Sequence, residues 1–420
     1  MKSFQALTAG LLSLAFASVA VATPTYIHLA SGQAFRGAVT AAIINTLDGA
    51  QAAYSGANLA NAASTVISGT IHSGPSAGQA VVYEIIWSGS NAGIQSASKI
   101  SPVVNKTFPT DANTLSSVSV NGTPGTYTFS GGTQFSVSAG NVTTQVDVTP
   151  SINGQGSTIF TGTGYTTLSD VVVGVTPLVF VRGNATTNDG TTTATNSAFA
   201  SITNITSLQA VNLLNGGLPL SQFTGNVSDQ SIAVYAIGRD EDAGQRVTTF
   251  DEVGFGAQST PVQYTPTIGT GTLSGVITAL NPAPAATVDG TLYPVGHGGY
   301  SSATTQAADL SRALTPGLGS FLISYFSTDN AASVTGAPGN YLSYNGVPFS
   351  VAAVQQGQYT FWSYSHVLYR PTLGGVALAA VTNLAKQLHD SDAAQGGILL
   401  STLAVGRQVE GGPVTFGNPY

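Results

Sequence analysis

Arg239 is the residue of this chain best suited by its setting to bind an anion. It directly follows an apolar run that ends at Gly238. Glu241 and Asp242 lie two and three residues after it, so these acids could hold its guanidinium group in place. A guanidinium presents parallel N–H groups that match two oxygens of a tetrahedral oxyanion. The alternative is an ordinary surface arginine beside acidic residues, and the local pattern does not decide between the two.

Two further glycine-containing loops follow apolar runs in the same way. Residues 32–35 (GQAF) follow the run 26–30, and residues 89–93 (GSNAG) follow the run 81–87. Each loop, like the arginine loop 239–245, leads into a segment with helical periodicity. The amino terminus of a helix carries unpaired N–H groups and a partial positive charge. Three such termini, if they converge, would bind an anion with few basic side chains.

Strands alternating with helices must position these loops. We expect strands in front of all three loops, the first at 26–30 and the third at 232–238. In the first unit, Val39, Ile43 and Leu47 recur at helical spacing and predict a helix that ends just after Leu47. This alternation implies an α/β fold with largely parallel strand pairing, in which ligands bind beyond the carboxyl ends of the strands.

Two other segments bear on domain organisation. Residues 105–145 are rich in Ser, Thr, Gly and Val and predict an inserted β-hairpin or small sheet. Residues 171–181 form an apolar run interrupted by Gly174 and Pro177, which predicts a bent strand that crosses between two lobes. A chain of 420 residues is longer than one hydrophobic core usually organises, so two lobes are expected.

The composition excludes several classes of protein. Charged residues make up 7% of the chain, against about 25% in a typical soluble domain. The formal net charge is −7 and the eleven basic residues are scattered, which argues against a nucleic-acid partner. The apolar fraction of 42% is too high for a disordered chain.

The first 22 residues are typical of a secretory signal peptide. An apolar stretch from Ala6 to Val21 follows Lys2 and ends beside the small-residue triplet 20–22. A retained membrane anchor is the alternative, but the stretch is short for a membrane span. The sequence contains no cysteine, so it can form neither a disulfide nor a lipid-modified cysteine. We therefore expect a periplasmic or secreted protein that begins at Thr23 and has no lipid anchor.

The order and spacing of the three loops resemble those of the phosphate-binding proteins of ABC transporters, a branch of the type 2 periplasmic binding proteins. The loop 239–245 (RDEDAGQ) resembles the family pattern Arg-x-Asp-x-Ser-Gly-Thr. Residues 32–35 are similar to its Gly-Ala-Thr-Phe loop, and residues 89–93 to its Gly-Ser-Ser-Gly-Gly loop. The segments 208–223 and 359–364 extend the resemblance over most of the chain.

This resemblance implies an α/β, two-lobed type 2 periplasmic-binding-protein-like fold with a β-rich insertion in lobe one. Lobe one would comprise 23–176 and 318–420, with the insertion at about 105–145, and lobe two 177–317. It also implies a monomer that binds a small inorganic oxyanion, phosphate or sulfate, in the cleft between the lobes. No catalysis, cofactor or metal is implied, and an ABC permease is a candidate partner. The implied ligand-binding residues are Ala34, Phe35, Ser90, Arg239, Gly244 and Gln245.

Several positions depart from the family pattern. Ala34 stands in place of a threonine, Ala243 in place of a serine and Gln245 in place of a threonine. Ile152 falls where the family has a ligand-facing aspartate, although Asp147 could take that role if the insertion shifts the register. Because side-chain donors are lost while backbone donors remain, the identity of the anion stays open. The alternative function is a secreted or cell-surface structural or adhesive protein that keeps the fold without the ligand.

Other signals are weaker. Ser76 lies in a nucleophile-elbow pattern, but a strand follows it where a helix is needed. Trp362 and its aromatic neighbours predict core packing rather than a sugar platform. Arg36 and the turn 296–300 could add donors to the anion site. The five histidines lack the spacing of a zinc site.

Overall fold

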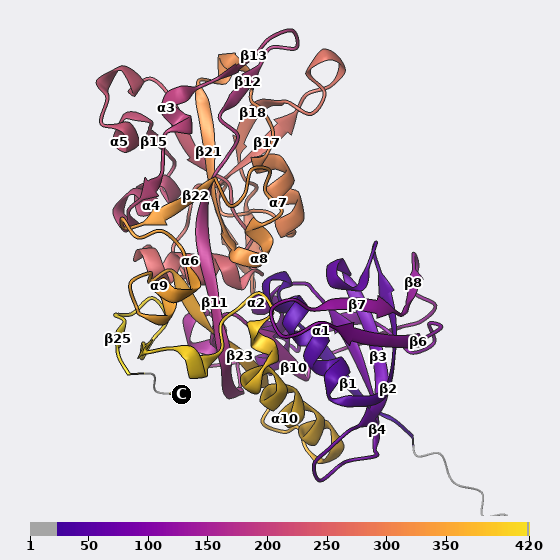
Figure 1. The fold of residues 1–420 in the computed structure, drawn as a ribbon. Helices are drawn as coiled ribbons and strands as arrows, with labels where there is room; N and C mark the ends of the chain where they lie inside the picture. Colours follow the sequence, from indigo (N-terminus) through magenta and orange to yellow (C-terminus); the bar gives the residue numbers. More distant parts are fainter. Residues whose placement is uncertain (1–22, 418–419) are drawn as a thin grey trace, which may run out of the picture.

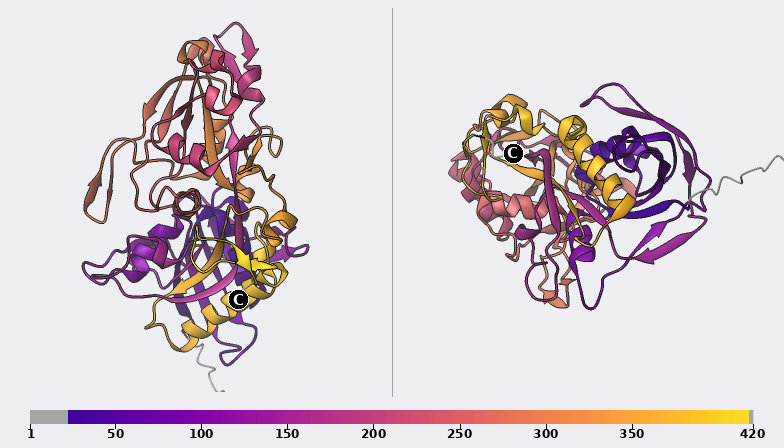
Figure 2. Two further views of the ribbon diagram at one scale, coloured as in Figure 1. Left: turned by 90° about the vertical axis from the view of Figure 1, so that its left-hand side faces the viewer. Right: turned by 90° about the horizontal axis from the view of Figure 1, so that it is seen from below.

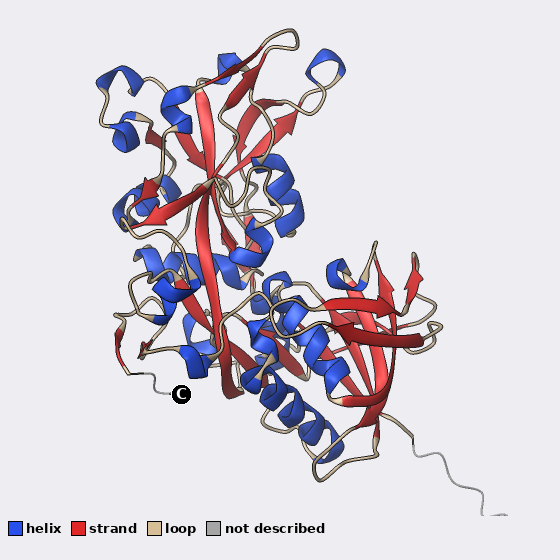
Figure 3. Cartoon of the chain, viewed as in Figure 1, coloured by secondary structure: helices blue, strands red, loops and turns tan. Residues whose placement is uncertain are grey.

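The computed structural model describes residues 23–417 and 420 (Figure 1). The expected signal peptide, residues 1–22, lies outside the described residues. A single mixed sheet of 15 strands runs through the molecule, with helices packed along it (Figure 3). Its strands are, in spatial order, β15 (Leu218–Pro219), β16 (Ala233–Ala236), β21 (Ser320–Ser327), β11 (Ser169–Arg182), β23 (Trp362–Tyr369), β10 (Val148–Ser151), β1 (Thr25–Ala30), β4 (Ala80–Ile86), β3 (Ser64–Ile71), β2 (Leu47–Ser55), β6 (Ser116–Asn121) and β7 (Thr128–Gly131), with β14 (Asn204–Ile205), β22 (Tyr341–Tyr344) and β8 (Thr133–Phe135) paired beside them.

The strand pairing is mixed, so the expectation of largely parallel pairing is wrong. The neighbours β4, β1 and β10 run parallel, as do β16 and β21. In contrast, β3 pairs antiparallel with β4 through a short connection, and β23 pairs antiparallel with both β10 and β11. A short connection returns the chain to the adjacent position in the opposite direction, whereas parallel neighbours need a longer crossover.

A helix follows each of the three loops as predicted, but two helices begin inside the predicted loops. Helix α2 starts at Ser90 and α6 at Gly244, a few residues earlier than expected. Helix α1 ends at Asn45, earlier than predicted, because Leu47 instead opens β2 and pairs with β3. The helices are α1 (Arg36–Asn45), α2 (Ser90–Ser98), α3 (Ser197–Ala200), α4 (Ser207–Leu214), α5 (Ser221–Thr224), α6 (Gly244–Val253), α7 (Ala303–Leu310), α8 (Thr328–Ala331), α9 (Val351–Gln355) and α10 (Gly375–Asp390).

Strand β11 links the two parts of the molecule. Its first part pairs with β23, its last five residues pair with β21, and its register shifts at a bulge between Val172 and Gly174. Figure 1 shows β11 as one long strand that continues from the lower into the upper part of the molecule. The predicted bent strand between the lobes is therefore present.

Two large hydrophobic cores lie on either side of this linking strand. One core takes residues from 27–173 and 367–393, and the other takes residues from 175–364 and 398–403. Figure 2 shows the corresponding two lobes one above the other. We propose that the lobes divide within β11 and within β23. This keeps the first expected boundary near residue 176 and moves the second from 318 to about 365 because β21, β22 and α9 pack in the second core.

The expected β-rich insertion at 105–145 contains five short strands. Strands β6 and β7 form a hairpin that adds to the edge of the main sheet beside β2, while β5 and β9 pair with each other. Small two-stranded sheets also occur outside the main sheet. The pairs outside the main sheet are β5 (Lys106–Pro109) with β9 (Asn141–Thr144), β12 (Thr186–Asn188) with β13 (Thr193–Thr195), β17 (Tyr264–Ile268) with β18 (Ile277–Pro282), β19 (Ala286–Val288) with β20 (Thr291–Tyr293), and β24 (Val405–Gly406) with β25 (Thr415–Phe416).

Candidate functional site

The three predicted loops meet where the two lobes touch. The parallel strands β1, β4 and β10 present their carboxyl ends at one edge, so the loops that follow them lie together. A Cβ atom on Gly32 would lie 2.7 Å from the hydroxyl of Ser90, and one on Gly244 would lie 3.0 Å from the Cβ of Ser90. A side chain at either position would force a neighbour to shift, so glycine allows these elements to approach closely.

The amino terminus of α2 already holds an oxygen atom from the chain itself. The N–H groups of Asn91 and Ala92 donate to the carbonyl oxygen of Asp242, at 3.0 and 3.4 Å. The side-chain amide of Asn91 also donates to the carbonyl of Glu241 at 2.9 Å. The sequence predicts an anion at this helix start but names Ser90 rather than Asn91 and Ala92. In this conformation a backbone carbonyl of lobe two occupies the donors of Asn91 and Ala92.

Ser90 provides a donor that the chain does not use. Its side chain is 0% exposed, and its hydroxyl oxygen has no hydrogen-bond partner within the described part of the chain. Buried hydroxyl groups nearly always find a partner. An unpaired hydroxyl at the first position of a helix, next to N–H groups that bind an oxygen, is therefore suited to a polar ligand.

Arg239 is buried at the same junction, but the predicted acids do not hold it. Its Nε donates to the carbonyl of Tyr300 at 2.8 Å, and its Nη2 to the carbonyl of Ser301 at 2.9 Å. Its Nη1 donates to Oε1 of Gln245 at 3.0 Å. The expectation that Glu241 and Asp242 orient the guanidinium is wrong because neutral oxygens take these positions. The guanidinium carries five N–H groups, so two remain beyond these contacts.

Gln245 connects the arginine to the second lobe's sheet. Besides accepting from Arg239, its amide donates to the hydroxyl of Ser327 at 2.9 Å. Ser327 is the last residue of β21, which runs parallel to β16. The sequence reasoning carried Gln245 as a replaced threonine, whereas the structure gives the longer side chain a bridging position.

A second buried arginine, Arg246, was missed by the sequence reasoning. Its guanidinium donates to the carbonyl oxygens of His297 and Arg239 at 2.5 and 3.2 Å, and contacts Nε2 of His297 at 3.1 Å. Burial and the neighbouring Arg246 lower the pKa of His297 to about 4. His297 is therefore neutral at pH 7 and does not add positive charge to the site. The available signal was the position of Arg246 in the first turn of a predicted helix.

Beside this junction lies a small cavity of about 40 Å³. Burial raises the pKa of Asp240 to about 7, against the opposing effect of Arg239, so the arginine loop carries less negative charge than its three acids suggest. The cavity is lined by Asn91, Ser157, Thr158, Ile159, Phe160, Glu241, Arg246, Val247, Ala257, Gln258, Val288, Tyr293 and His297.

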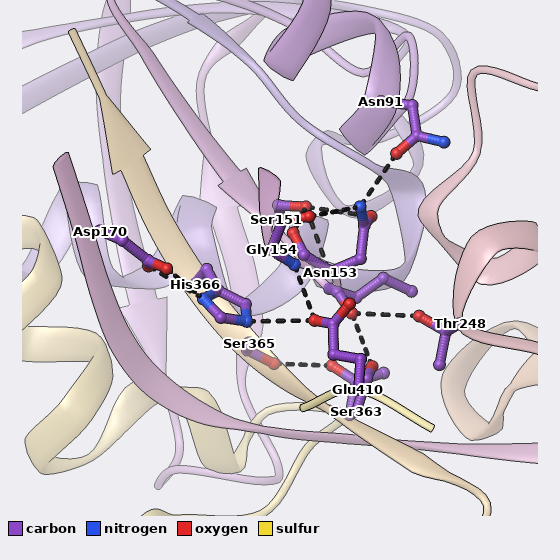
Figure 4. A network of polar contacts seen from close by, with 12 residues as sticks. Asn91, Ser151, Asn153, Gly154, Asp170, Thr248, Ser363, Ser365, His366 and Glu410 are labelled. Carbon is purple, nitrogen blue, oxygen red and sulfur yellow. Dashed lines mark hydrogen bonds and ion pairs between the residues drawn. The ribbon is translucent and has the colours of Figure 1, made fainter. Parts of the chain in front are cut away.

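Ile152 lies at the junction, whereas Asp147 does not. A Cβ atom on Gly244 would come 2.9 Å from Cγ1 of Ile152 and 2.4 Å from Oδ1 of Asn153. The amide of Asn153 donates to Oδ1 of Asn91 at 3.0 Å (Figure 4). Asp147 instead accepts from His28 and pairs with Arg370. Asn153, which the sequence reasoning did not single out, is therefore the polar side chain nearest Gly244.

The first loop contributes mainly backbone. Ala34 and Phe35 are both buried, and the N–H of Phe35 donates to the carbonyl of Gly32 at 3.3 Å. The guanidinium of Arg36 donates to residues 61–62, so the expected extra donor is directed elsewhere. Gln33 instead touches lobe two, where its Oε1 accepts from the first N–H of α7 at 3.1 Å.

The remaining sequence signals find structural roles. Trp362 is fully buried and stacks on the guanidinium of Arg407 at 4.0 Å, which confirms core packing. Ser76 lies in a turn between β3 and β4 rather than on a strand-to-helix elbow. Across residues 23–417 and 420, no group of His, Asp and Glu side chains is arranged to hold a metal ion, and no helix has the length and apolar character needed to cross a membrane.

Comparison with known proteins gives only distant likenesses. No protein-family model and no curated protein matches the chain. Among solved structures, one described as a phosphate ABC transporter substrate-binding protein with bound phosphate, from Clostridium perfringens, is 10% identical and has a TM-score of 0.41, covering 89% of this chain and 99% of its own. An ABC-type phosphate transport receptor from Vibrio cholerae is 10% identical with a TM-score of 0.31, covering 57% of this chain and 74% of its own. Likenesses at such low identities and TM-scores carry no argument about family or ligand.

Proposed function

We propose that this chain binds a small inorganic oxyanion, phosphate or sulfate, outside the cytoplasm, in the cleft between its two lobes and without transforming it. The proposal includes a monomer released by cleavage before Thr23, with an ABC permease as its candidate partner. The observation that carries it is the amino terminus of α2. There the N–H groups of Asn91 and Ala92 bind an oxygen atom and the hydroxyl of Ser90 is buried without a described partner.

Binding requires the lobes to separate. The carbonyl of Asp242 stands on the donors of α2, and the cavity beside it, about 40 Å³, is small for a tetrahedral oxyanion. If the loop 239–243 withdraws, an oxyanion replaces the carbonyl oxygen and gains the hydroxyl of Ser90. An anion gains more than a neutral carbonyl from these donors because hydrogen bonds to a charged group are about twice as strong.

The second candidate is a structural or adhesive protein that keeps the fold without the ligand. The contact of Asp242 with α2 favours it because the chain fills its own anion site, and the chain's own oxygens already engage Arg239. The two candidates differ in whether an added oxyanion displaces this contact.

Titration calorimetry of the mature chain with phosphate and with sulfate tests the proposal. We expect saturable binding of one or both, with a rise in melting temperature because the ligand binds only the folded state. Chloride at equal ionic strength is the control. If neither oxyanion gives heat or a shift above that of chloride, the structural candidate replaces the binding candidate.

The neighbourhood of Ile152 predicts the preference between the two anions. A carboxylate at this position would accept the proton of hydrogen phosphate and repel sulfate, but Ile152 does neither, and Asp147 is engaged away from the site. We expect phosphate and sulfate to bind within about tenfold of each other, which is about 1.4 kcal/mol. A preference for phosphate above a hundredfold, about 2.7 kcal/mol, would mean that a carboxylate of the loop 239–243, not Ile152, faces the ligand.

A further inference from the structure

A second and larger cavity adjoins the small one and shares Ser157, Ala257 and Gln258 with its lining. It has a volume of about 810 Å³, which is within the range of small-molecule sites. Three carboxylates line it, from Asp170 on β11, Asp251 on α6 and Glu410 near the carboxyl terminus. One imidazole, that of His366 on β23, also lines it. Negative groups therefore outnumber the positive group in its wall.

The imidazole of His366 is shared between two of these carboxylates. Its Nδ1 lies 2.9 Å from Asp170 and its Nε2 lies 3.3 Å from Glu410 (Figure 4). One imidazolium can neutralise only one of the two charges. Asp251 has no ion-pair partner among the described residues and accepts only from neutral groups, including the N–H of Ala257 at 3.1 Å. The cavity wall is therefore left with uncompensated negative charge.

Glu410 is fixed by a hydrogen bond through one carboxylate oxygen, and its other oxygen has no hydrogen-bond partner among the described residues. Its side chain is 7% exposed, and its Oε1 accepts from the N–H of Gly154 at 2.7 Å. Its Oε2 has no hydrogen-bond partner in the described part of the chain. Burying a carboxylate oxygen without a partner is costly, and its repulsion adds to burial in raising the pKa of Asp251 to about 6. A cation between Asp251 and Glu410 would relieve both effects.

The same cavity has aromatic and neutral polar walls. The rings of Tyr364 and Tyr420 meet edge to face at 4.9 Å, and both line the cavity. Aromatic rings attract organic cations through their electron-rich faces. The amide side chains of Gln258 and Gln408, also in the lining, can accept hydrogen bonds from an ammonium group. This combination suits an organic cation better than an anion.

We propose that this cavity binds a small organic cation that carries primary ammonium groups, with Asp251 and Glu410 as its charge partners and Tyr364 as its aromatic wall. The charged residues of this site differ from those of the oxyanion site, although Ser157, Ala257 and Gln258 line both cavities. The inference does not depend on the proposed function. A bare metal ion does not fit the observations, since the described carboxylates and histidines form no arrangement that could hold one.

Calorimetry with 1,4-diaminobutane tests this inference, and 1,4-butanediol, which has nearly the same shape but no charge, is the control ligand. We expect saturable binding of the diamine and none of the diol. In Asp251→Asn and in Glu410→Gln the affinity for the diamine should fall by about tenfold or more, as for loss of one partly buried charge pair. Both variants keep a side-chain oxygen that can accept the hydrogen bond from Ala257 N–H or Gly154 N–H that the carboxylate accepts in the unmodified chain. A melting curve checks that they fold.

Asp390→Asn is the matched control variant because it removes one carboxylate from the exposed surface of α10. It should bind the diamine as the unmodified chain does. Three outcomes would overturn the inference. The first is the absence of binding heat with the diamine. The second is equal binding of the diol, which would indicate a polyol site. The third is a diamine affinity that is unchanged in both Asp251→Asn and Glu410→Gln.

Discussion

At the scale of single residues, Ser90 is the buried polar side chain whose loss should affect ligand binding more than the stability of the fold. Most buried polar side chains at the junction stabilise the fold. Arg239 and Gln245, for example, contact each other and two further segments of lobe two, at Tyr300 and Ser327. The hydroxyl of Ser90 has no such contact within the described residues. A group that is buried, polar and unused by the fold is the one whose removal should affect the ligand and little else.

Ser90→Ala is therefore expected to weaken oxyanion binding by about tenfold to a hundredfold, since a hydrogen bond to a charged group is worth about 1.5–3 kcal/mol. The free energy of unfolding should change by less than about 1 kcal/mol because no described hydrogen bond is lost. Ser98→Ala on the same helix is the matched control. It loses the bond to the carbonyl of Ile94 and should lower stability by about 1 kcal/mol with unchanged affinity. Calorimetry and urea unfolding measure the two effects, and equal affinities for both variants would place the anion away from α2.

At the scale of elements, the start of α6 sets how closely the lobes approach. Gly244 is the first residue of α6, and it packs against Ile152, Asn153 and Ser90 with no room for a Cβ atom. Because Gly244 lies against Ser90, the N–H groups at the starts of α6 and α2 come close to each other. The close approach is thus a property of the glycine rather than of the helix.

Gly244→Ala should disturb this contact. The added methyl group forces neighbours to shift, which typically costs about 1–3 kcal/mol of unfolding free energy. Oxyanion affinity should fall as well because the start of α6 can then no longer close against Ser90 and Ile152 once the ion has entered. Gly317→Ala, at a position where a Cβ atom meets nothing within 4 Å, is the control and should change neither quantity. Denaturant unfolding with calorimetry checks both, and a fully stable Gly244→Ala variant would show that the lobes do not pack this closely.

At the scale of the whole molecule, two histidines on different strands each lie between two carboxylates, which raise the pKa of the imidazole. Burial disfavours the charged imidazolium of His366, but the hydrogen bond to Asp170 and the ion pair with Glu410 raise its pKa to about 9. His28 on β1 shows the same balance, since burial is outweighed by Asp147 and Glu84 and its pKa is also about 9. Both imidazoles join strands to distant segments of the chain. Protonation thus contributes to the stability of the whole fold.

The free energy of unfolding should therefore fall as the pH rises. A histidine whose pKa is raised in the folded state binds more protons there than in the unfolded chain, where its pKa is about 6.5. Its contribution is complete below pH 6.5 and is lost as the pH passes 9. For His366 the full loss is about 3 kcal/mol. Urea unfolding between pH 6.5 and 9.5 measures it, and a curve without this decline would contradict the assignment.

His366→Gln should flatten that decline because one of the two titrating groups is gone. His72→Gln is the matched control, since His72 is mostly exposed and pairs only with an exposed aspartate. Its pH profile should follow that of the unmodified chain. Equal slopes for His366→Gln and the unmodified chain would show that another group causes the decline.

The sequence by itself determined the local elements and the three loops. The strand β1, the presence of a helix after the second loop and the long bent strand β11 all follow from patterns within a few residues. Helical periodicity, caps and glycine loops depend on near neighbours in the chain, so they can be predicted without knowing what packs against them.

The tertiary structure decided which partners these elements meet. Only the fold places the carbonyl of Asp242 at the helix start at Asn91. Only the fold brings Glu410 to Gly154, more than two hundred positions away in the sequence, and to His366 on β23. The antiparallel return of β23 was likewise invisible to local patterns. Contacts of this kind depend on how the two cores pack and on which oxygen atom then lies within hydrogen-bond distance of a buried donor. No local pattern of residues carries that information.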